Sequence, residues 1–191
     1  MTQPIWAILA ISCVIAGSAP PVSAQPVDEA PTAPEAAASV AAMTGQRLIE
    51  LATRIDPELE AAGSGARFKI QEHELMLVFD EAANRMRVMA PVANSAALEP
   101  EFLTRMLQAN FDSALDARYA IASDIVWSVY IHPLAELTET QFASALAQVV
   151  TAAATYGGSF SSGALVYGGG DSAELNEKLL RELEKRLQTE A

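Results

Sequence analysis

The chain has few of the residues from which catalytic and metal sites are built. Its 191 residues include one cysteine, Cys13, and two histidines, His73 and His132. His73 lies between two glutamates in an expected turn and His132 ends an expected strand, so they do not supply the converging ligands of a metal site. The sequence also lacks a recognisable serine-nucleophile motif or phosphate-binding loop. We therefore predict no catalytic, cofactor or metal site.

Basic residues are also scarce. The chain has 12 Lys and Arg residues against 24 Asp and Glu residues, which gives a net charge of −12. Such a chain repels the phosphate backbone of nucleic acids and the headgroups of anionic membranes. We therefore expect no nucleic-acid partner, and membrane contact only through an uncleaved N-terminal segment.

The sequence has no apolar run long enough for a membrane-spanning helix. The run at residues 5–19 covers about 15 residues, whereas a helix needs about 20 to cross a bilayer. The small residues Val22, Ser23 and Ala24 follow it and form a possible cleavage site. We interpret residues 1–24 as a signal peptide, which predicts a periplasmic or secreted location. An uncleaved anchor and a lipid anchor at Cys13 are the alternatives.

Residues 25–43 are rich in proline and alanine and have no periodicity, which is typical of a disordered linker. Residues 44–158 contain the periodic segments and are the predicted domain. Residues 159–170 are rich in glycine. Residues 171–191 begin with a capping box at Asp171–Glu174 and form a predicted C-terminal helix.

The periodic segments predict an α+β fold. Apolar spacing of the helical kind occurs at residues 44–55, 100–111 and 138–157, and alternation of the strand kind occurs in five segments. The order is α-β-β-β-α-β-β-α, followed by the C-terminal helix. We therefore expect an antiparallel sheet of about five strands flanked by helices. The expected strands lie at residues 67–71, 75–79, 85–90, 117–122 and 125–131.

Two local patterns make more detailed predictions. Thr138 and Gln141 fit a capping box at the start of a helix. In the last strand, Trp127 lies in phase with Ile125, Val129 and Ile131, so we expect this set to face the core. Tyr130 then lies on the opposite face, where it is a candidate contact for a partner.

The C-terminal helix carries an apolar stripe next to a face of charged pairs. Three interpretations stay open: the stripe packs on its own domain, contacts a partner or second copy, or belongs to a loosely attached helix. The candidate partner-binding residues are Tyr130, Leu175, Leu179, Leu183 and Leu187.

The central part of the chain resembles the type III secretion chaperone-like superfamily, which includes the bacterial YbjN-like proteins. The resemblance rests on a pattern of apolar positions over about 60 residues rather than on a chemical signature. It implies a compact α+β domain, often dimeric, that binds polypeptide segments and is not an enzyme. The pattern consists of Met106-Leu107-Gln108-Ala109-Asn110-Phe111, two strands, Ile131-His132-Pro133-Leu134, Leu137, and a helix with Phe142, Leu146 and Val150.

Three functions are compatible with the sequence. The first is an exported, non-enzymatic module that holds a peptide segment or partner protein. A homodimer of this module is also possible. The second is a self-associating scaffold subunit of the cell envelope. The third is an enzyme with an unrecognised site, which would require a polar cleft with perturbed titratable groups.

Overall fold

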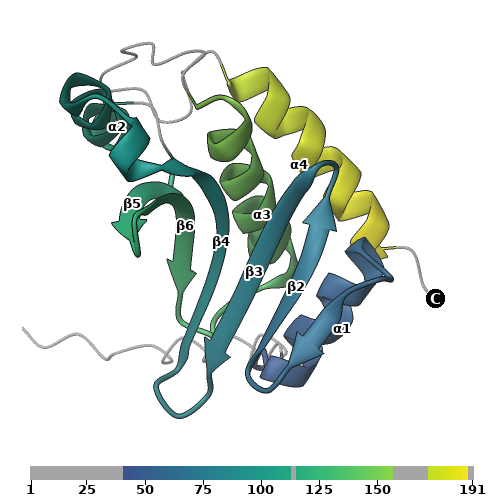
Figure 1. Ribbon diagram of the computed structural model, residues 1–191. Coiled ribbons are helices and arrows are strands. Elements are labelled where there is room, and N and C mark those ends of the chain that lie inside the picture. Colours follow the sequence, from purple (N-terminus) through teal and green to yellow (C-terminus); the bar gives the residue numbers. More distant parts are fainter. Residues whose placement is uncertain (1–40, 113–114, 157–171, 189–191) are drawn as a thin grey trace, which may run out of the picture. The chain divides into compact units, whose positions relative to one another are not determined.

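The computed structural model describes residues 41–112, 115–156 and 172–188. Six antiparallel strands form one sheet in the order β1-β2-β3-β4-β6-β5 (Figure 1). The predicted α+β fold and element order are confirmed, with the short β1 as an additional strand. The strands are β1 Glu60–Ala62, β2 Gly65–Ile70, β3 His73–Asp80, β4 Arg85–Asn94, β5 Arg118–Ala122 and β6 Ile125–His132; the helices are α1 Gly45–Ile55, α2 Pro100–Asp112, α3 Glu139–Ala154 and α4 Ala173–Gln188, with a 3-10 turn η1 at Ser95–Ala97.

Several predicted segments lie outside this description. They are the signal peptide 1–24, the glycine-rich segment 159–170 and the linker 25–43 up to residue 40. Within the described residues, no helix is both long and apolar enough to cross a membrane.

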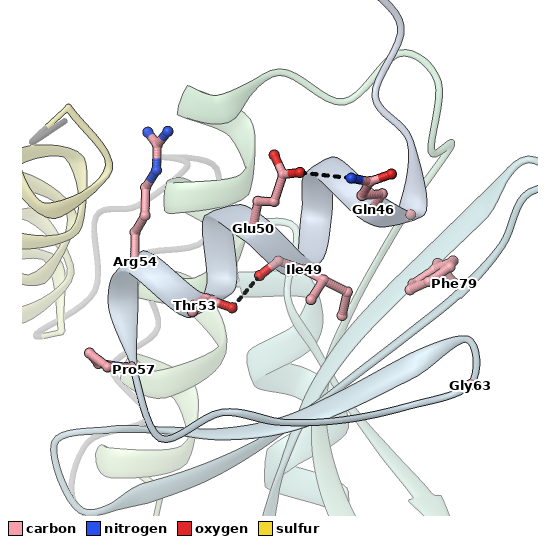
Figure 2. A pocket seen from close by; sticks show the side chains of 9 residues that line it. Gln46, Ile49, Glu50, Thr53, Arg54, Pro57, Gly63 and Phe79 are labelled. Atoms are coloured by element: carbon pink, nitrogen blue, oxygen red, sulfur yellow. Dashed lines mark hydrogen bonds between the residues drawn. The ribbon is translucent and has the colours of Figure 1, made fainter. Parts of the chain in front are cut away.

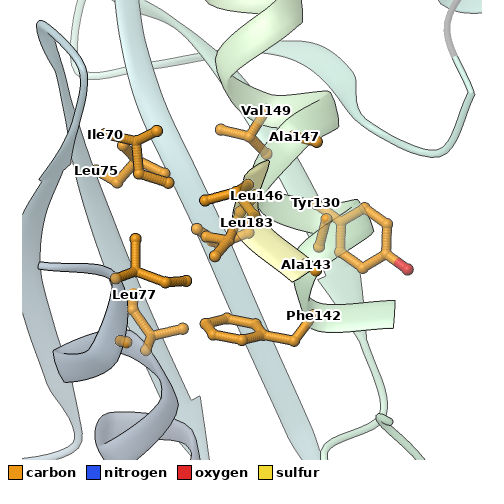
Figure 3. Close-up of a cluster of buried hydrophobic side chains, with 14 of the residues drawn as sticks. Ile70, Leu75, Leu77, Tyr130, Phe142, Ala143, Leu146, Ala147, Val149 and Leu183 are labelled. Atoms are coloured by element: carbon orange, nitrogen blue, oxygen red, sulfur yellow. The ribbon is translucent and has the colours of Figure 1, made fainter. Parts of the chain in front are cut away.

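Helix α3 occupies the centre of the core. The predicted capping box starts it: the Thr138 hydroxyl accepts a hydrogen bond from the Gln141 backbone N–H, and the Gln141 side chain accepts one from the Thr138 N–H. Phe142 and Leu146 are completely buried and face the strands (Figure 3). Small side chains lie between these large ones, which lets the helix lie close to its neighbours. The buried alanines of α3 are Ala143, Ala145, Ala147 and Ala153.

The hairpin between β5 and β6 uses a tight two-residue turn. Ser123 and Asp124 both have positive φ, at 51° and 59°. Two consecutive left-handed residues match the right-handed twist of the flanking strands, and aspartate tolerates this conformation better than most residues. The predicted hairpin with Ser123-Asp124 as its turn is therefore confirmed.

The predicted phase of β6 is wrong. Val126, Ser128 and Tyr130 point into the core, whereas Trp127 is only half-buried and Ile131 is 54% exposed. Both faces of this strand carry large apolar side chains, so alternation alone does not indicate which face is covered. The covered face is the one on which α3 packs, and there the small Ser128 makes room for the helix.

Helix α4 packs on its own domain. Leu179, Leu183 and Leu187 are at most 4% exposed and belong to the same core as α3 and the sheet. At its C-terminal end, Arg54 of α1 donates to the Leu187 carbonyl at 2.8 Å, and Arg186 donates to the Ile55 carbonyl at 3.1 Å. These contacts join α4 to α1, so the first of the three interpretations holds for the described residues.

This packing makes a prediction about stability. Leu183→Ala removes a fully buried side chain and should lower the free energy of unfolding by about 2–5 kcal/mol. Leu180→Ala, at a half-buried position three residues earlier, should cost clearly less. Denaturant unfolding followed by circular dichroism measures both. An unchanged stability of the Leu183 variant, together with a loss of self-association, would instead make α4 an interaction helix.

Candidate partner-binding surfaces

Helix α1 is held against the sheet by one face only. The Thr44 hydroxyl caps its N-terminus by accepting a hydrogen bond from the Arg47 N–H at 3.2 Å. The core side of the helix is buried, at Leu48, Leu51, Ala52 and Ile55. The next positions around the helix, including Ile49 and Thr53, therefore remain available to line a groove.

An open groove of about 850 Å³ runs along this second face of α1 (Figure 2). The turn between β1 and β2 and the end of β3 form its other side. Its volume lies in the range of about 300–1,000 Å³ that is typical of binding pockets. Ile49 from α1 and Phe79 from β3 are half-buried and give it apolar walls. The remaining lining residues are Gly45, Gln46, Glu50, Thr53, Arg54, Pro57 and Gly63.

Gly45 shapes one end of the groove. A Cβ atom at this position would lie 2.1 Å from Cε2 of Phe79, so the ring occupies the space that a side chain would take. The Gly45 backbone N–H also donates to the Glu81 carboxylate at 2.8 Å. Glycine is therefore needed here for a close approach, which brings Phe79 against the first turn of α1.

The polar groups of the groove are mostly bonded to one another. The Gln46 amide donates to the Glu50 carboxylate at 3.1 Å, and the Thr53 hydroxyl donates to the Ile49 carbonyl at 2.8 Å. Within the described residues there is no group of three His, Cys, Asp or Glu side chains that could hold a metal. The groove therefore offers apolar contacts with a polar rim.

Arg47 of α1 forms ion pairs with Glu139 of α3 and with Glu50 of its own helix. Arg47 Nη2 lies 2.5 Å from Glu139 Oε1, and Nη1 lies 3.2 Å from Glu50 Oε2. Hydrogen bonding to Glu139, and then to Glu50, raises the pKa of the Arg47 guanidinium above its ordinary value. All three side chains are solvent-accessible, so this contact orients the helix and contributes little stability.

Helix α2 presents a second apolar surface. Leu107 and Phe111 are four residues apart on one face and are 66% and 81% exposed. In the sequence, Met106, Leu107 and Phe111 recur at helical spacing, which indicates one apolar face, but the structure buries Met106 and Ala109 and leaves Leu107 and Phe111 exposed. Large apolar side chains with this exposure are typical of a protein contact.

Strand β5 holds α2 firmly in place. The Asn110 amide donates to the Tyr119 carbonyl at 3.1 Å, and its oxygen accepts from the Tyr119 N–H at 2.7 Å. Tyr119 in turn donates its hydroxyl to the Ala152 carbonyl of α3 at 2.7 Å, and burial raises its pKa to about 12. The helix that carries the exposed pair is thus joined to β5 and α3 through Asn110 and Tyr119, in addition to its buried Met106 and Ala109.

The structure brings most of the sequence-predicted partner residues into the core. Tyr130 is 7% exposed, and its ring stacks on His132 with the centroids 6.2 Å apart. Leu179, Leu183 and Leu187 are buried as described above, and Leu175 is half-buried. These side chains contact their own domain, so partner contact through them stays a prediction. For the four leucines, such contact would require α4 to move away from its domain.

The sequence reasoning missed the residues that line the exposed surfaces. Ile49 follows Leu48 in a helix with an otherwise regular apolar face, and Phe79 is in phase with Leu75 and Leu77 in the expected strand 75–79, which indicates a core position. Ile49 lies one position outside the main apolar face of the helix, and such a residue is the sequence signal that could have indicated a second apolar surface.

The central part of the chain is similar to a known protein family. The family model described as the Tir chaperone protein (CesT) family matches residues 46–156. A chain in the crystal structure of the ExsC–ExsE complex is 20% identical, with a TM-score of 0.46 over 57% of this chain and 86% of that chain. No curated protein sequence matches the chain.

The match to the CesT family model corrects the predicted cellular location. Type III secretion chaperones of the CesT family are cytoplasmic, so the prediction of a periplasmic or secreted protein is wrong. The apolar run at residues 5–19 has the composition of an export signal, but composition alone does not establish export.

The match covers α1 through the end of α3, which includes the sheet, the α1 groove and the exposed face of α2. The resemblance inferred from the apolar pattern is confirmed, and with it a protein-binding chaperone fold of a non-enzymatic class. The chain belongs to the Tir chaperone protein (CesT) family.

Proposed function

We propose that the chain is a chaperone that holds a segment of a partner protein in the groove beside α1. The observation that supports this most directly is the groove of about 850 Å³ with Ile49 and Phe79 on opposite sides. An apolar side chain of the partner would insert between them, as anchor residues do in helix-in-groove and strand recognition.

The polar rim fits the same use. Gln46, Glu50 and Thr53 follow one another along the outer side of α1 at helical spacing. Their amide, carboxylate and hydroxyl groups can exchange their internal hydrogen bonds for bonds to the backbone of a bound segment. The chain would bind and release its partner without covalent chemistry.

We further propose that the chain forms a homodimer through α2. A two-fold dimer buries the same patch on both subunits, and Leu107 and Phe111 provide a compact apolar centre for such a patch. A stable dimer buries about 800 Å² on each partner, which would require the rest of α2 and β5 to take part. Ile121 of β5, which is 57% exposed, would extend the contact between the two subunits.

The groove proposal predicts that Ile49→Glu weakens peptide binding at least about tenfold, because a carboxylate replaces an apolar wall. Peptides selected by display against the wild-type chain are titrated by fluorescence anisotropy. Gln108→Glu, an exposed change on α2 outside the groove, adds the same charge and should leave the affinity unchanged. Equal affinity of both variants and wild type would place the peptide site elsewhere.

The contact between Gly45 and Phe79 predicts a coupled pair of substitutions. Gly45→Ala should destabilise the chain by about 1–3 kcal/mol, because the new Cβ displaces the Phe79 ring. In a Phe79→Ala background the same substitution should cost much less. Thermal unfolding of the four proteins measures this coupling. Additive effects would show that the ring is not what limits position 45.

The dimer proposal predicts that Phe111→Ser shifts the wild-type dimer toward monomer in sedimentation equilibrium. Because Phe111 is 81% exposed, the melting temperature measured at low protein concentration should barely change. Gln188→Ser, an exposed change on α4 outside the proposed contact, is the control. A wild-type chain that stays monomeric at high concentration would contradict the dimer.

A further inference from the structure

The sheet has one face that no described helix covers. Helices α1, α3 and α4 pack on the other face, where the core lies (Figure 1). On the uncovered face, Arg67, Val78, Arg87 and Ile131 are exposed. Neither proposed contact of the previous section uses this surface, which we call the open face.

Strand pairing fixes the order of side chains on the open face. In one row, Met76, Met89 and Val129 are cross-strand neighbours, with Arg67 at one end and Arg118 at the other. In the next row, Arg87 lies between Val78 and Ile131. Cross-strand neighbours have Cβ atoms about 4.5–5.5 Å apart, so each arginine borders directly on apolar side chains.

The open face is basic within an acidic protein. Of the 12 basic residues, five lie on it: Arg67, Lys69, Arg85, Arg87 and Arg118.

Three acidic residues also lie on the open face, and each is opposite a basic one: Glu60 pairs with Arg67, Glu74 with Lys69 and Asp80 with Arg85. Arg87 differs, because Val78 and Ile131 are its neighbours on both sides. Among the described residues, no ion pair joins Arg87 to a carboxylate.

The surface around Arg87 is hollowed. A depression of about 390 Å³ is lined by Val78, Phe79, Asp80, Arg85, Met86, Arg87, Met89 and Ile131. Asp80 lies opposite Arg85, so Arg87 is the guanidinium group that apolar side chains flank on both sides. An apolar floor beside two guanidinium groups suits a ligand that carries carboxylates next to apolar side chains, since guanidinium groups bind carboxylates with two parallel hydrogen bonds.

We propose that the open face binds an extended acidic peptide segment in which carboxylates and apolar side chains alternate along the docking side. Charge complementarity favours this occupant: the net charge of −12 acts against phosphate-rich nucleic acids and anionic membranes as a whole, whereas a short segment can reach the basic strip locally. The depression shares Phe79 with the lining of the α1 groove, whereas Arg85 and Arg87 do not line that groove, so variants of Arg87 and of Ile49 test the two proposals separately.

The test uses three labelled peptides with serine at every second position. Their docking positions alternate between leucine and glutamate, leucine and glutamine, or leucine and lysine. The full chain should bind the glutamate peptide at least about tenfold more tightly than either of the others in anisotropy titrations. Equal binding of the lysine peptide would overturn the proposal.

Charge-reversed variants locate the site. Arg87→Glu should weaken binding of the glutamate peptide at least about tenfold, and Arg87→Gln should have an intermediate effect. Arg181→Glu on α4 makes the same change in net charge at an exposed position away from the sheet and should have little effect. Circular dichroism confirms that each variant is folded.

Two results would overturn the proposal. Equal losses in the Arg87 and Arg181 variants would mean that net charge alone governs binding. A change in oligomeric state caused by Arg87→Glu, without a loss of peptide affinity, would assign the open face to a second copy of the chain. Persistence of the Arg87 effect in an Ile49→Glu background would separate this site from the α1 groove.

Discussion

The rest of the fold depends on the burial of α3 on nearly all of its sides. Phe142, Leu146, Val149 and Val150 are at most 1% exposed, and the alanines between them are buried as well. A helix that is apolar all round needs cover on two sides. The sheet supplies one side and α4 the other, which explains why the C-terminal leucines are core residues. Gln148 of α3 also positions the chain that leads into β5, because its side-chain oxygen accepts hydrogen bonds from the Asp116 and Ala117 N–H groups just before that strand.

This arrangement uses only one face of the sheet for the core. The helices that stabilise the domain all pack there, so the other surfaces are free for other uses. They are the α1 groove, the exposed pair on α2 and the open face with its arginines. In a protein-binding chaperone such a division is useful, because partner contacts can change without disturbing the packing that keeps the domain folded.

Membership of the CesT family agrees with the chemistry of these surfaces. The groove combines Ile49 and Phe79 with polar groups that already bond to one another, and the described residues hold no cluster of metal ligands. Binding at such surfaces gains free energy from burying apolar area and from local charge complementarity. Both depend on shape more than on particular reactive residues, which is why a pattern of apolar positions revealed the family when no chemical motif was present.

The sequence by itself determined the local elements. The capping box at Thr138, the turn at Ser123-Asp124 and the alternation in β2, β3 and β4 are short-range signals, since each depends on residues a few positions apart. The tertiary structure decided which faces are buried. In β6 both faces are apolar, and only the position of α3 places Tyr130 inside and Trp127 toward the open face. The same holds for α4, whose stripe suits any apolar surface, and for Phe79, whose place against Gly45 follows from packing between distant parts of the chain.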